Sequence, residues 1–116
     1  MADWQPRRGL EAFDGYLNGG ILGTLIDCHS NWTAIAALLG RSGAATAPST
    51  VTAELAIRFR HPTPSNRPIR LIGRATDVDE RRVTVETAIE SDSTVTATGV
   101  ATFVVVGPDH PAFGRW

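Results

Sequence analysis

The feature that most constrains the fold of this chain is a change of hydrophobic period near residue 50. Residues 20–39 contain no proline and are read as one helix, with Gly40 in the place of a helix stop. Beyond residue 50, apolar and polar residues alternate with a period of two, which is typical of strands. We expect four strands, at residues 51–60, 68–78, 83–90 and 94–106. Because the links between them are short, antiparallel neighbours and an α+β fold are predicted.

The remaining segments are rich in turn formers. Residues 1–17 read as an irregular N-terminal segment, 41–49 as a loop of small residues, and 107–116 as a C-terminal tail. Gly99 interrupts the last strand and is a candidate β-bulge. A length of 116 residues is enough for one core, so residues 1–116 are predicted to form a single domain.

The predicted helix carries one acid on a face of small residues. On a helical wheel, the face of Asp27 also holds Gly20, Gly23, Thr24, Ser30, Asn31, Ala34 and Leu38. An apolar stripe suited to packing on a sheet falls on the far side. It consists of Leu22, Leu25, His29, Trp32 and Ala36, flanked by Ile21, Ile26 and Leu39. The helix thus looks buried all round. A buried carboxylate is a functional candidate, and the alternative is that Asp27 only makes a structural hydrogen bond to a neighbouring chain or loop.

Two inferences follow from this helix. A four-stranded sheet covers only one side of it, so a second copy of the chain is the natural cover for the Asp27 side, in a homodimer or homotetramer. Gly19 and Gly20 open the helix, where free backbone N–H groups and the helix dipole could bind an oxyanion. Without Asp27 nearby, a plain turn before a helix would be the favoured interpretation of the glycine pair.

Composition narrows the classes of partner. The net charge of −1 gives no basic excess for nucleic acid, although all eleven cationic side chains are arginine, which suits local phosphate sites. A single cysteine, Cys28, cannot form an internal disulfide, and the N-terminus shows no signal peptide, so a cytoplasmic protein is expected. Polar residues within 19–40 make that stretch a poor membrane span.

Three motifs together resemble the PaaI-like acyl-CoA thioesterases of the hotdog superfamily. The segment NGGILGTLIDCHSNW (18–32) is similar to the family's His-Gly-Gly stretch, with an acid nine residues after the His position. The segment VTAELAIRFRHPTP (51–64) is similar to the strand after the family's helix, and DERRVTVETAIE with TVTATGVATFVVV to its last two strands. The resemblance covers about residues 13–106 and implies one long helix wrapped by an antiparallel sheet.

The resemblance also implies a reaction and roles for particular residues. Acyl-CoA thioesters would be hydrolysed with Asp27 as general base or nucleophile, Thr52 as its assistant, and the N–H groups around Gly19 and Gly20 as oxyanion hole. In the dimers that this chain resembles, the helix of one subunit faces the partner, so Asp27 of one chain is expected to work with Thr52 of the other. Asn18 stands where the family has His. Asn31 would hold the carboxylate, a water or the substrate. The expected contacts of the CoA phosphates are Arg58, Arg60, Arg81 and Arg82.

This sequence departs from the family pattern in two further places. Glu80 replaces a turn glycine, and only 17 residues precede Asn18, so the N-terminal strand is expected to be short or missing. No cofactor is implied beyond the CoA of the substrate, and no metal-ligand spacing is present. Cys28 and His29 are sequence neighbours, which point about 100° apart on a helix, so His29 is expected to be packed and not catalytic. Trp32 is expected in the core.

Two other functions share the same fold. A non-catalytic protein that binds acyl-CoA or another small ligand would keep Asp27 for structure alone. A hotdog hydratase or dehydratase would pair a His with an acid across the site, and no His is placed for that.

Overall fold

The computed structural model describes residues 1–43 and 47–114. Part of the predicted 41–49 loop and the end of the predicted tail therefore lie outside the described residues. The elements in chain order are β1 (Ala2–Trp4), a short 3₁₀ helix η1 (Arg8–Leu10), β2 (Glu11–Phe13), β3 (Tyr16–Leu17), α1 (Gly19–Ser42), β4 (Thr50–Phe59), β5 (Ile69–Val78), β6 (Arg82–Ser91) and β7 (Thr94–Val105).

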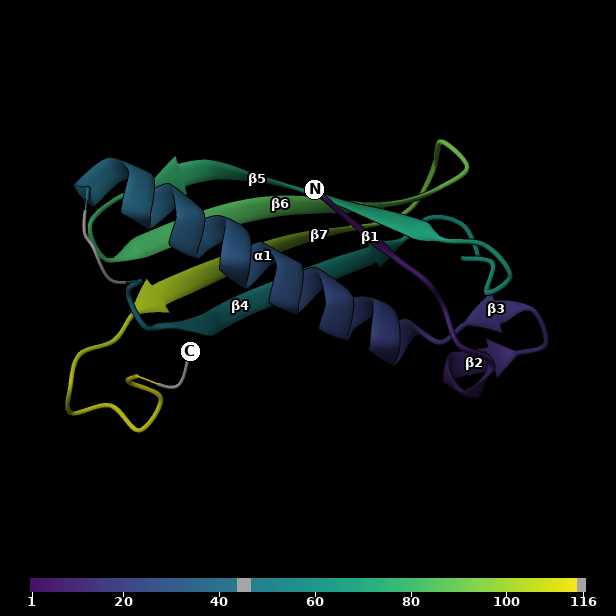
Figure 1. Ribbon diagram of the computed structural model, residues 1–116, viewed down its shortest axis with the longest axis horizontal. Helices are drawn as coiled ribbons and strands as arrows, with labels where there is room; N and C mark the ends of the chain where they lie inside the picture. Colours follow the sequence, from purple (N-terminus) through teal and green to yellow (C-terminus); the bar gives the residue numbers. More distant parts are fainter. Residues whose placement is uncertain (44–46, 115–116) are drawn as a thin grey trace.

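Five strands form one antiparallel sheet in the order β1-β5-β6-β7-β4, and α1 lies across one face of it (Figure 1). The α+β prediction and the four strands after the helix are confirmed, with ends within one residue of those expected. The predicted short N-terminal strand is β1, whose three residues pair with Ile69–Leu71. β2 and β3 form a separate two-stranded sheet within the segment expected to be irregular.

The structure confirms the predicted helix, but the helix extends beyond its predicted C-terminal end. α1 continues through Gly40 to Ser42 and is capped by Gly43, which adopts a left-handed conformation (φ 66°) and donates its N–H to the carbonyl of Leu39 at 2.9 Å. A glycine within a helix costs only about 1 kcal/mol, so Gly40 does not suffice as a stop. The left-handed cap at Gly43 ends the helix instead.

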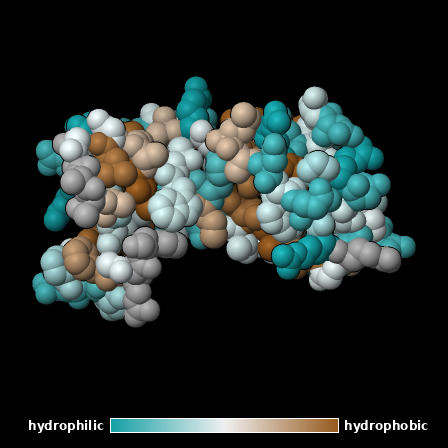
Figure 2. All heavy atoms as spheres, in the orientation of Figure 1, coloured by the Kyte–Doolittle hydropathy of each residue, from teal (hydrophilic) through white to brown (hydrophobic). Residues whose placement is uncertain are grey.

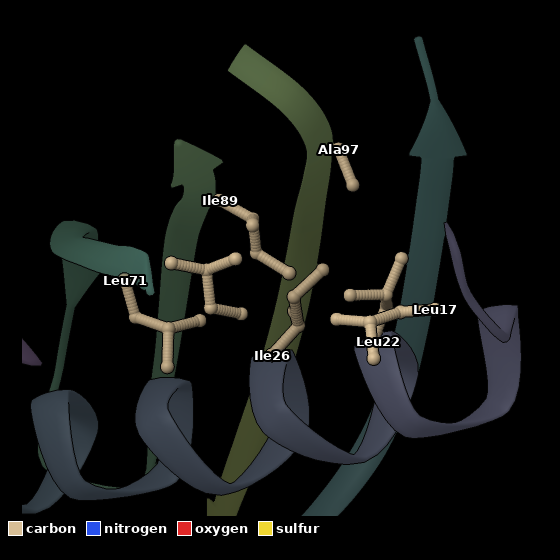
Figure 3. Close-up of a cluster of buried hydrophobic side chains, with 7 residues drawn as sticks. Leu17, Leu22, Ile26, Leu71, Ile89 and Ala97 are labelled. Atoms are coloured by element: carbon tan, nitrogen blue, oxygen red, sulfur yellow. The ribbon is translucent and has the colours of Figure 1, made fainter. Parts of the chain in front are cut away.

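Two clusters of buried side chains join α1 to the sheet. Leu22 and Ile26 of α1 point toward Leu71, Ile89 and Ala97 of the strands (Figure 3). The second cluster lies toward the other end of the helix and consists of Ala34, Leu38, Val83, Val85, Ala101 and Phe103. Burial of these apolar surfaces fixes the helix on the sheet.

The helix face that meets the sheet agrees with the predicted stripe at Leu22, Leu25 and His29 but departs from it at Trp32 and Ala36. Side chains four residues apart face the sheet and are buried, in the row Leu22, Ile26, Ser30, Ala34 and Leu38. A parallel row is exposed and consists of Gly20, Thr24, Cys28, Trp32 and Ala36. Trp32, expected in the core, is 53% exposed in the single chain. The reason is that rows of residues four apart wind slowly around the helix, and such a row follows the twist of the sheet.

Gly99 is not a bulge; it permits close packing. A Cβ there would lie 2.6 Å from Cγ2 of Ile26, so only glycine lets the buried helix approach β7 this closely. The extra residues in the ladders of the five-stranded sheet are Ala53 of β4, Thr76 of β5 and Thr96 of β7. The bulge at Ala53 has the greatest consequence, because it changes which β4 side chains face α1.

The exposed side of α1 is almost free of charge. Asp27 and Arg41 are the charged residues among the 24 of the helix. Pale and brown residues predominate where α1 lies in Figure 2, whereas hydrophilic residues gather toward the right-hand end of that face. Within the described residues, no helix combines the length and the apolar character that crossing a membrane would require.

Candidate active site

Asp27 of α1 and Thr52 of β4 meet in one chain. The hydroxyl of Thr52 donates a 2.7 Å hydrogen bond to Oδ1 of Asp27. Asp27 is half-buried and Thr52 is exposed, so the pair opens to the surface of the protomer. A carboxylate held by a hydroxyl and still reachable by water is suited to act as a base or a nucleophile.

The bulge at Ala53 explains how Thr52 reaches the helix. The sequence alternation places Val51 and Ala53 on the same face as Leu55. In the structure Thr52 pairs with the fully buried Phe103, and Leu55 pairs with the equally buried Ala101, so both face the helix. The extra residue between them reverses the alternation, as bulges beside functional sites often do.

One expectation for Asp27 needs correction. The carboxylate is open on one side in the single chain, where Thr24 and Cys28 are exposed, and this is the side that a second copy was predicted to cover. The expectation that Asp27 works with Thr52 of a second chain is wrong, since the two residues are hydrogen-bonded within one chain. The antiparallel course of α1 and β4 brings them together.

Asn31 lies one helical turn beyond Asp27 and bonds the same strand. Its Oδ1 accepts a 2.5 Å hydrogen bond from the hydroxyl of Thr50, and both side chains are buried. Among the described residues no hydrogen bond involves Nδ2 of Asn31, so this donor remains for a water or a ligand. Its place beside Asp27 agrees with the predicted position, whereas Thr50 was not foreseen.

Asn18 caps the helix N-terminus. Its Oδ1 accepts from the N–H of Ile21 at 2.7 Å, and its Nδ2 donates to the carbonyl of Leu10 at 2.9 Å. No hydrogen bond of the described residues uses the N–H groups of Gly19 and Gly20. Asn18 therefore orders the helix start and leaves these two donors free for an anion, with the positive end of the helix dipole behind them.

The two halves of the predicted site lie apart on the same helix. Asp27 follows Gly20 by seven residues, a rise of about 10 Å along the axis. A reacting carbonyl carbon must lie within about 3 Å of the attacking group while its oxygen meets the donors. Within one chain, the Asp27 backbone and the Gly20 amide are therefore nearly two helical turns apart.

A cavity of about 420 Å³ opens beside the free amides. Phe59 of β4 packs on the helix start, with a ring carbon 3.1 Å from where a Cβ of Gly19 would lie. Phe13 and Tyr16, whose ring centroids are 5.1 Å apart, form another part of the wall, and Leu22 belongs to the lining as well. The walls are mainly apolar, so this cavity could receive an apolar group whose carbonyl meets the helix N-terminus.

The four predicted arginines fall into two groups. Arg58 pairs with Thr98 of β7, whereas Arg82 pairs with Val104, six residues along that strand, which is about 20 Å. Arg60 belongs to the lining of the cavity beside the helix N-terminus. All four arginines are exposed, and the structure does not bring the two groups together.

The turn that carries Arg81 and Arg82 is ordered by Asp79. The backbone N–H groups of both arginines donate to Oδ1 of Asp79 at 2.8 Å. These two bonds hold the pKa of Asp79 below its ordinary value. The turn is thus fixed by its own acid, with Glu80 in place of the family's glycine.

His29 packs on the side of α1 away from Asp27, as expected. Its imidazole lies against Gly73 of β5, where a Cβ would be 3.1 Å from the ring. Nε2 is buried without a hydrogen-bond partner among the described residues, and burial lowers the pKa of His29.

Cys28 is a free, exposed cysteine. Within residues 1–43 and 47–114, no three His, Cys, Asp or Glu side chains are grouped as a metal site would need.

Thr50 and Phe59 are the residues near this site that sequence reasoning missed. Thr50 and Thr52 are two apart on a strand and so share a face, a signal that pointed to two hydroxyls beside the helix. The alternating pattern identifies Phe59 only as a residue of the predicted strand 51–60. Its position over Gly19 depends on the course of α1, which the pattern does not give.

The comparisons with known proteins agree with this architecture. No protein-family model matches the chain, and no curated protein matches it. Among solved structures, a thioesterase superfamily protein from Shewanella loihica is 33% identical over 91% of this chain and 82% of its own, with a TM-score of 0.77.

Two more distant structures share the fold and were solved with coenzyme A. A Bacillus halodurans protein with CoA is 23% identical over 90% of this chain and 65% of its own, with a TM-score of 0.76. A Thermus thermophilus thioesterase complexed with coenzyme A and zinc is 13% identical over 97% and 82%, with a TM-score of 0.73. The arrangement of one long helix on an antiparallel sheet is the hotdog fold, and the chain belongs to the thioesterase superfamily.

Proposed function

We propose that this chain is a PaaI-like acyl-CoA thioesterase that hydrolyses its substrate to a free acid and CoA. The observation that supports this most is the hydrogen bond from Thr52 to the half-buried carboxylate of Asp27. In a thioesterase superfamily fold, this is an acid oriented by a second side chain and open to water. The reaction needs no cofactor, because CoA is the leaving group.

Asp27 serves as the general base in the simplest form of the reaction. Its carboxylate takes a proton from a water molecule as the water oxygen attacks the thioester carbonyl. The carbon–sulfur bond then breaks, and the CoA sulfur leaves and takes up a proton. Alternatively, the carboxylate attacks the carbonyl directly, the carbon–sulfur bond breaks, and the CoA thiolate leaves and takes up a proton. The mixed anhydride that remains is then hydrolysed by water to the free acid and the Asp27 carboxylate. Thr52 orients the same carboxylate in both routes.

A second copy of the chain supplies the oxyanion hole in this proposal. Because Asp27 and the amides of Gly19 and Gly20 lie about 10 Å apart along one helix, a shared carbonyl needs donors from elsewhere. Two antiparallel α1 helices related by a twofold axis place the helix start of each beside Asp27 of the other. Each dimer then has two sites, and each site uses both chains.

The exposed row of α1 is suited to such a contact. Gly20, Thr24 and Cys28 are exposed and small, so two helices can approach closely with Thr24 at the crossing point. β4 forms an edge of the sheet beside this row and exposes Leu55 and Phe59. Uncovered apolar side chains and an open strand edge both favour a partner of the same kind.

The acyl and CoA parts of the substrate have candidate positions on either side of the amides. The cavity beside Gly19 has the apolar walls that an acyl group needs. Coenzyme A in the two distant structures supports a CoA-type ligand. Of the predicted phosphate contacts, Arg60 belongs to the lining of this cavity, so we assign it the CoA phosphates ahead of Arg81 and Arg82. Arg58 alternates with Ile57 and Phe59, which face α1, and so lies on the other face of the sheet.

The experiment that tests the proposal separates hydrolysis from binding. The purified chain is mixed with a panel of aromatic, short-chain and medium-chain acyl-CoAs, and release of free thiol is followed together with calorimetric binding. We expect turnover of at least one member. Binding of acyl-CoA with no thiol release across the panel would favour the non-catalytic ligand-binding alternative.

A further inference from the structure

We infer that Thr50 and Asn31 are positioning residues that hold Thr52 on Asp27. The inference rests on the proposed function for its kinetic readout, and on geometry alone for its structural one. The hydroxyl of Thr50 donates to Oδ1 of Asn31 at 2.5 Å, and the two side chains are 1% and 6% exposed. This bond lies directly beside the exposed Thr52–Asp27 bond.

The two bonds match in spacing. Asn31 follows Asp27 by one helical turn, a rise of about 6 Å, and Thr50 precedes Thr52 by two strand residues, about 6.8 Å. Since α1 and β4 run antiparallel, the bonds lie side by side between the same two elements. The buried bond therefore fixes the separation and the register at which the exposed one forms.

Near Thr52, β4 depends on contacts with α1 to keep its position. It is an edge strand, hydrogen-bonded to β7 alone, and its ladder is interrupted at Ala53, immediately after Thr52. A bulge leaves a residue unpaired and bends the strand. Ladder hydrogen bonds therefore hold Thr52 less firmly than its neighbours, and the Thr50–Asn31 bond is a buried polar link only two strand residues away.

The direct test is Thr50→Val, which keeps the shape of the side chain and removes its donor. We expect kcat for acyl-CoA hydrolysis to fall about tenfold or more, because small displacements of a catalytic group are costly in rate. KM should stay within about twofold, since neither residue is assigned to CoA. Thr50→Ser, which restores the hydroxyl, should recover kcat to within about threefold of the wild type.

Thr87→Val is the matched control. Thr87 is 2% exposed and shares a single 2.6 Å hydrogen bond with Ser30, the helix residue before Asn31. This bond joins α1 to β6 at the centre of the sheet, away from β4. The control should lower stability to a similar degree and leave kcat within about twofold of the wild type. An equal loss of kcat in both variants would overturn the inference in favour of general destabilisation.

A double variant shows whether Thr50 acts by positioning Thr52 or acts directly in the reaction. In a Thr52→Ala background, Thr50→Val should cause no further loss of kcat beyond about twofold, because its effect passes through Thr52. Its effect on urea unfolding should persist. Full additivity of the two losses of kcat would contradict the inference. Thr50→Ala serves in the same cycle if the valine variant does not fold.

A crystal structure of the Thr50→Val protein tests the inference without any activity. We expect the distance from Thr52 Oγ1 to Asp27 Oδ1 to lengthen beyond hydrogen-bond reach, about 3.5 Å. A distance unchanged from 2.7 Å would overturn the inference whatever the kinetics. Absence of turnover in the wild type, together with a lengthened distance in the variant, would reject the thioesterase proposal and uphold the positioning.

Discussion

The hydroxyl of Thr52 and the carboxylate of Asp27 are joined by a 2.7 Å hydrogen bond within one chain. The free amides of Gly19 and Gly20 lie about 10 Å farther toward the start of the same helix. The base and its assistant therefore come from one subunit in the proposed site, and the oxyanion hole from the other. This division gives a test by mixing subunits.

Subunit exchange between Asp27→Asn and Gly20→Pro proteins should restore activity. Proline at this position removes one N–H donor and is tolerated in the first turn of a helix. In a mixed dimer, one site carries both defects and the other has native Asp27 and native Gly20. About half of the dimers are mixed and half of their sites are intact, so activity should approach a quarter of the wild type.

Exchange between Asp27→Asn and Thr52→Ala proteins is the control for that experiment. Both residues belong to the same half of the site, so no mixed dimer contains an intact one. Activity should not exceed the mean of the two parents, with exchange confirmed by native mass spectrometry. Recovery in this pair, and none with Gly20→Pro, would reverse the assignment of residues to subunits.

The helix crossing can be tested at Thr24. A Thr24→Arg substitution places a long charged side chain at the proposed contact of the two helices, where space is available only for small residues. We expect a folded monomer by light scattering, with thiol release reduced at least tenfold because each site needs two chains. Ala36→Arg, on the same exposed row three turns later, should remain dimeric. A dimeric and active Thr24→Arg protein would place the interface elsewhere.

The close packing of α1 on β7 predicts that a larger side chain at Gly99 lowers the stability of the protein. A Cβ there would lie 2.6 Å from Cγ2 of Ile26, which is fully buried. We expect Gly99→Ala to lower the free energy of unfolding by about 1–3 kcal/mol through overpacking, as measured by urea denaturation. At Gly107 a Cβ meets nothing within 4 Å, so Gly107→Ala should change stability little. Equal stability of the two variants would contradict the close approach.

The fold could be predicted from the sequence because its signals are local. The Pro-free helix and the period-two strands appear directly in the pattern, and short links require antiparallel pairing. The face of α1 could be predicted only for its first half, at Leu22, Leu25 and His29, because a wheel assumes a straight stripe. The twisted sheet selects the row of Leu22 and Ile26, so Trp32 becomes exposed.

The site could be predicted in part for a similar reason. Asp27 and the glycines of the helix start are visible as a pattern on one helix. The pairing of Thr52 with Asp27 in the same chain depends on the bulge at Ala53, and alternation alone does not reveal an inserted residue. The motif predicts a catalytic role for Asn18. Only its hydrogen bonds with Ile21 and Leu10 show that it caps the helix.

The burial of His29 predicts that the folded protein loses stability in mild acid. Burial of the imidazole, with a smaller contribution from the positive N-terminal amino group, lowers its pKa below the ordinary value near 6.5. The unfolded chain therefore binds this proton more readily than the folded one. The contribution to stability is complete above pH 6.5 and is lost as the pH falls below that value toward the folded pKa.

Replacement of the imidazole should remove this dependence. His29→Gln should show a smaller decrease in the free energy of unfolding between pH 7 and pH 5 than the wild type, as measured by denaturant titrations at each pH. Thiol release at pH 7.5 should change less than about twofold, since His29 faces β5 and not Asp27. Parallel pH profiles for the two proteins would show that the imidazole has no such effect.

Thiol release by the Asp27→Asn protein tests the central claim most directly. The variant keeps the size of the side chain and removes the basic oxygen, so kcat should fall about 10²-fold or more, the scale of a lost general base. Its far-ultraviolet circular dichroism and its oligomeric state should match the wild type. Asp109→Asn, in the exposed C-terminal segment, should retain full activity. Near-normal turnover by a correctly folded Asp27→Asn protein would contradict the claim that Asp27 performs the hydrolysis.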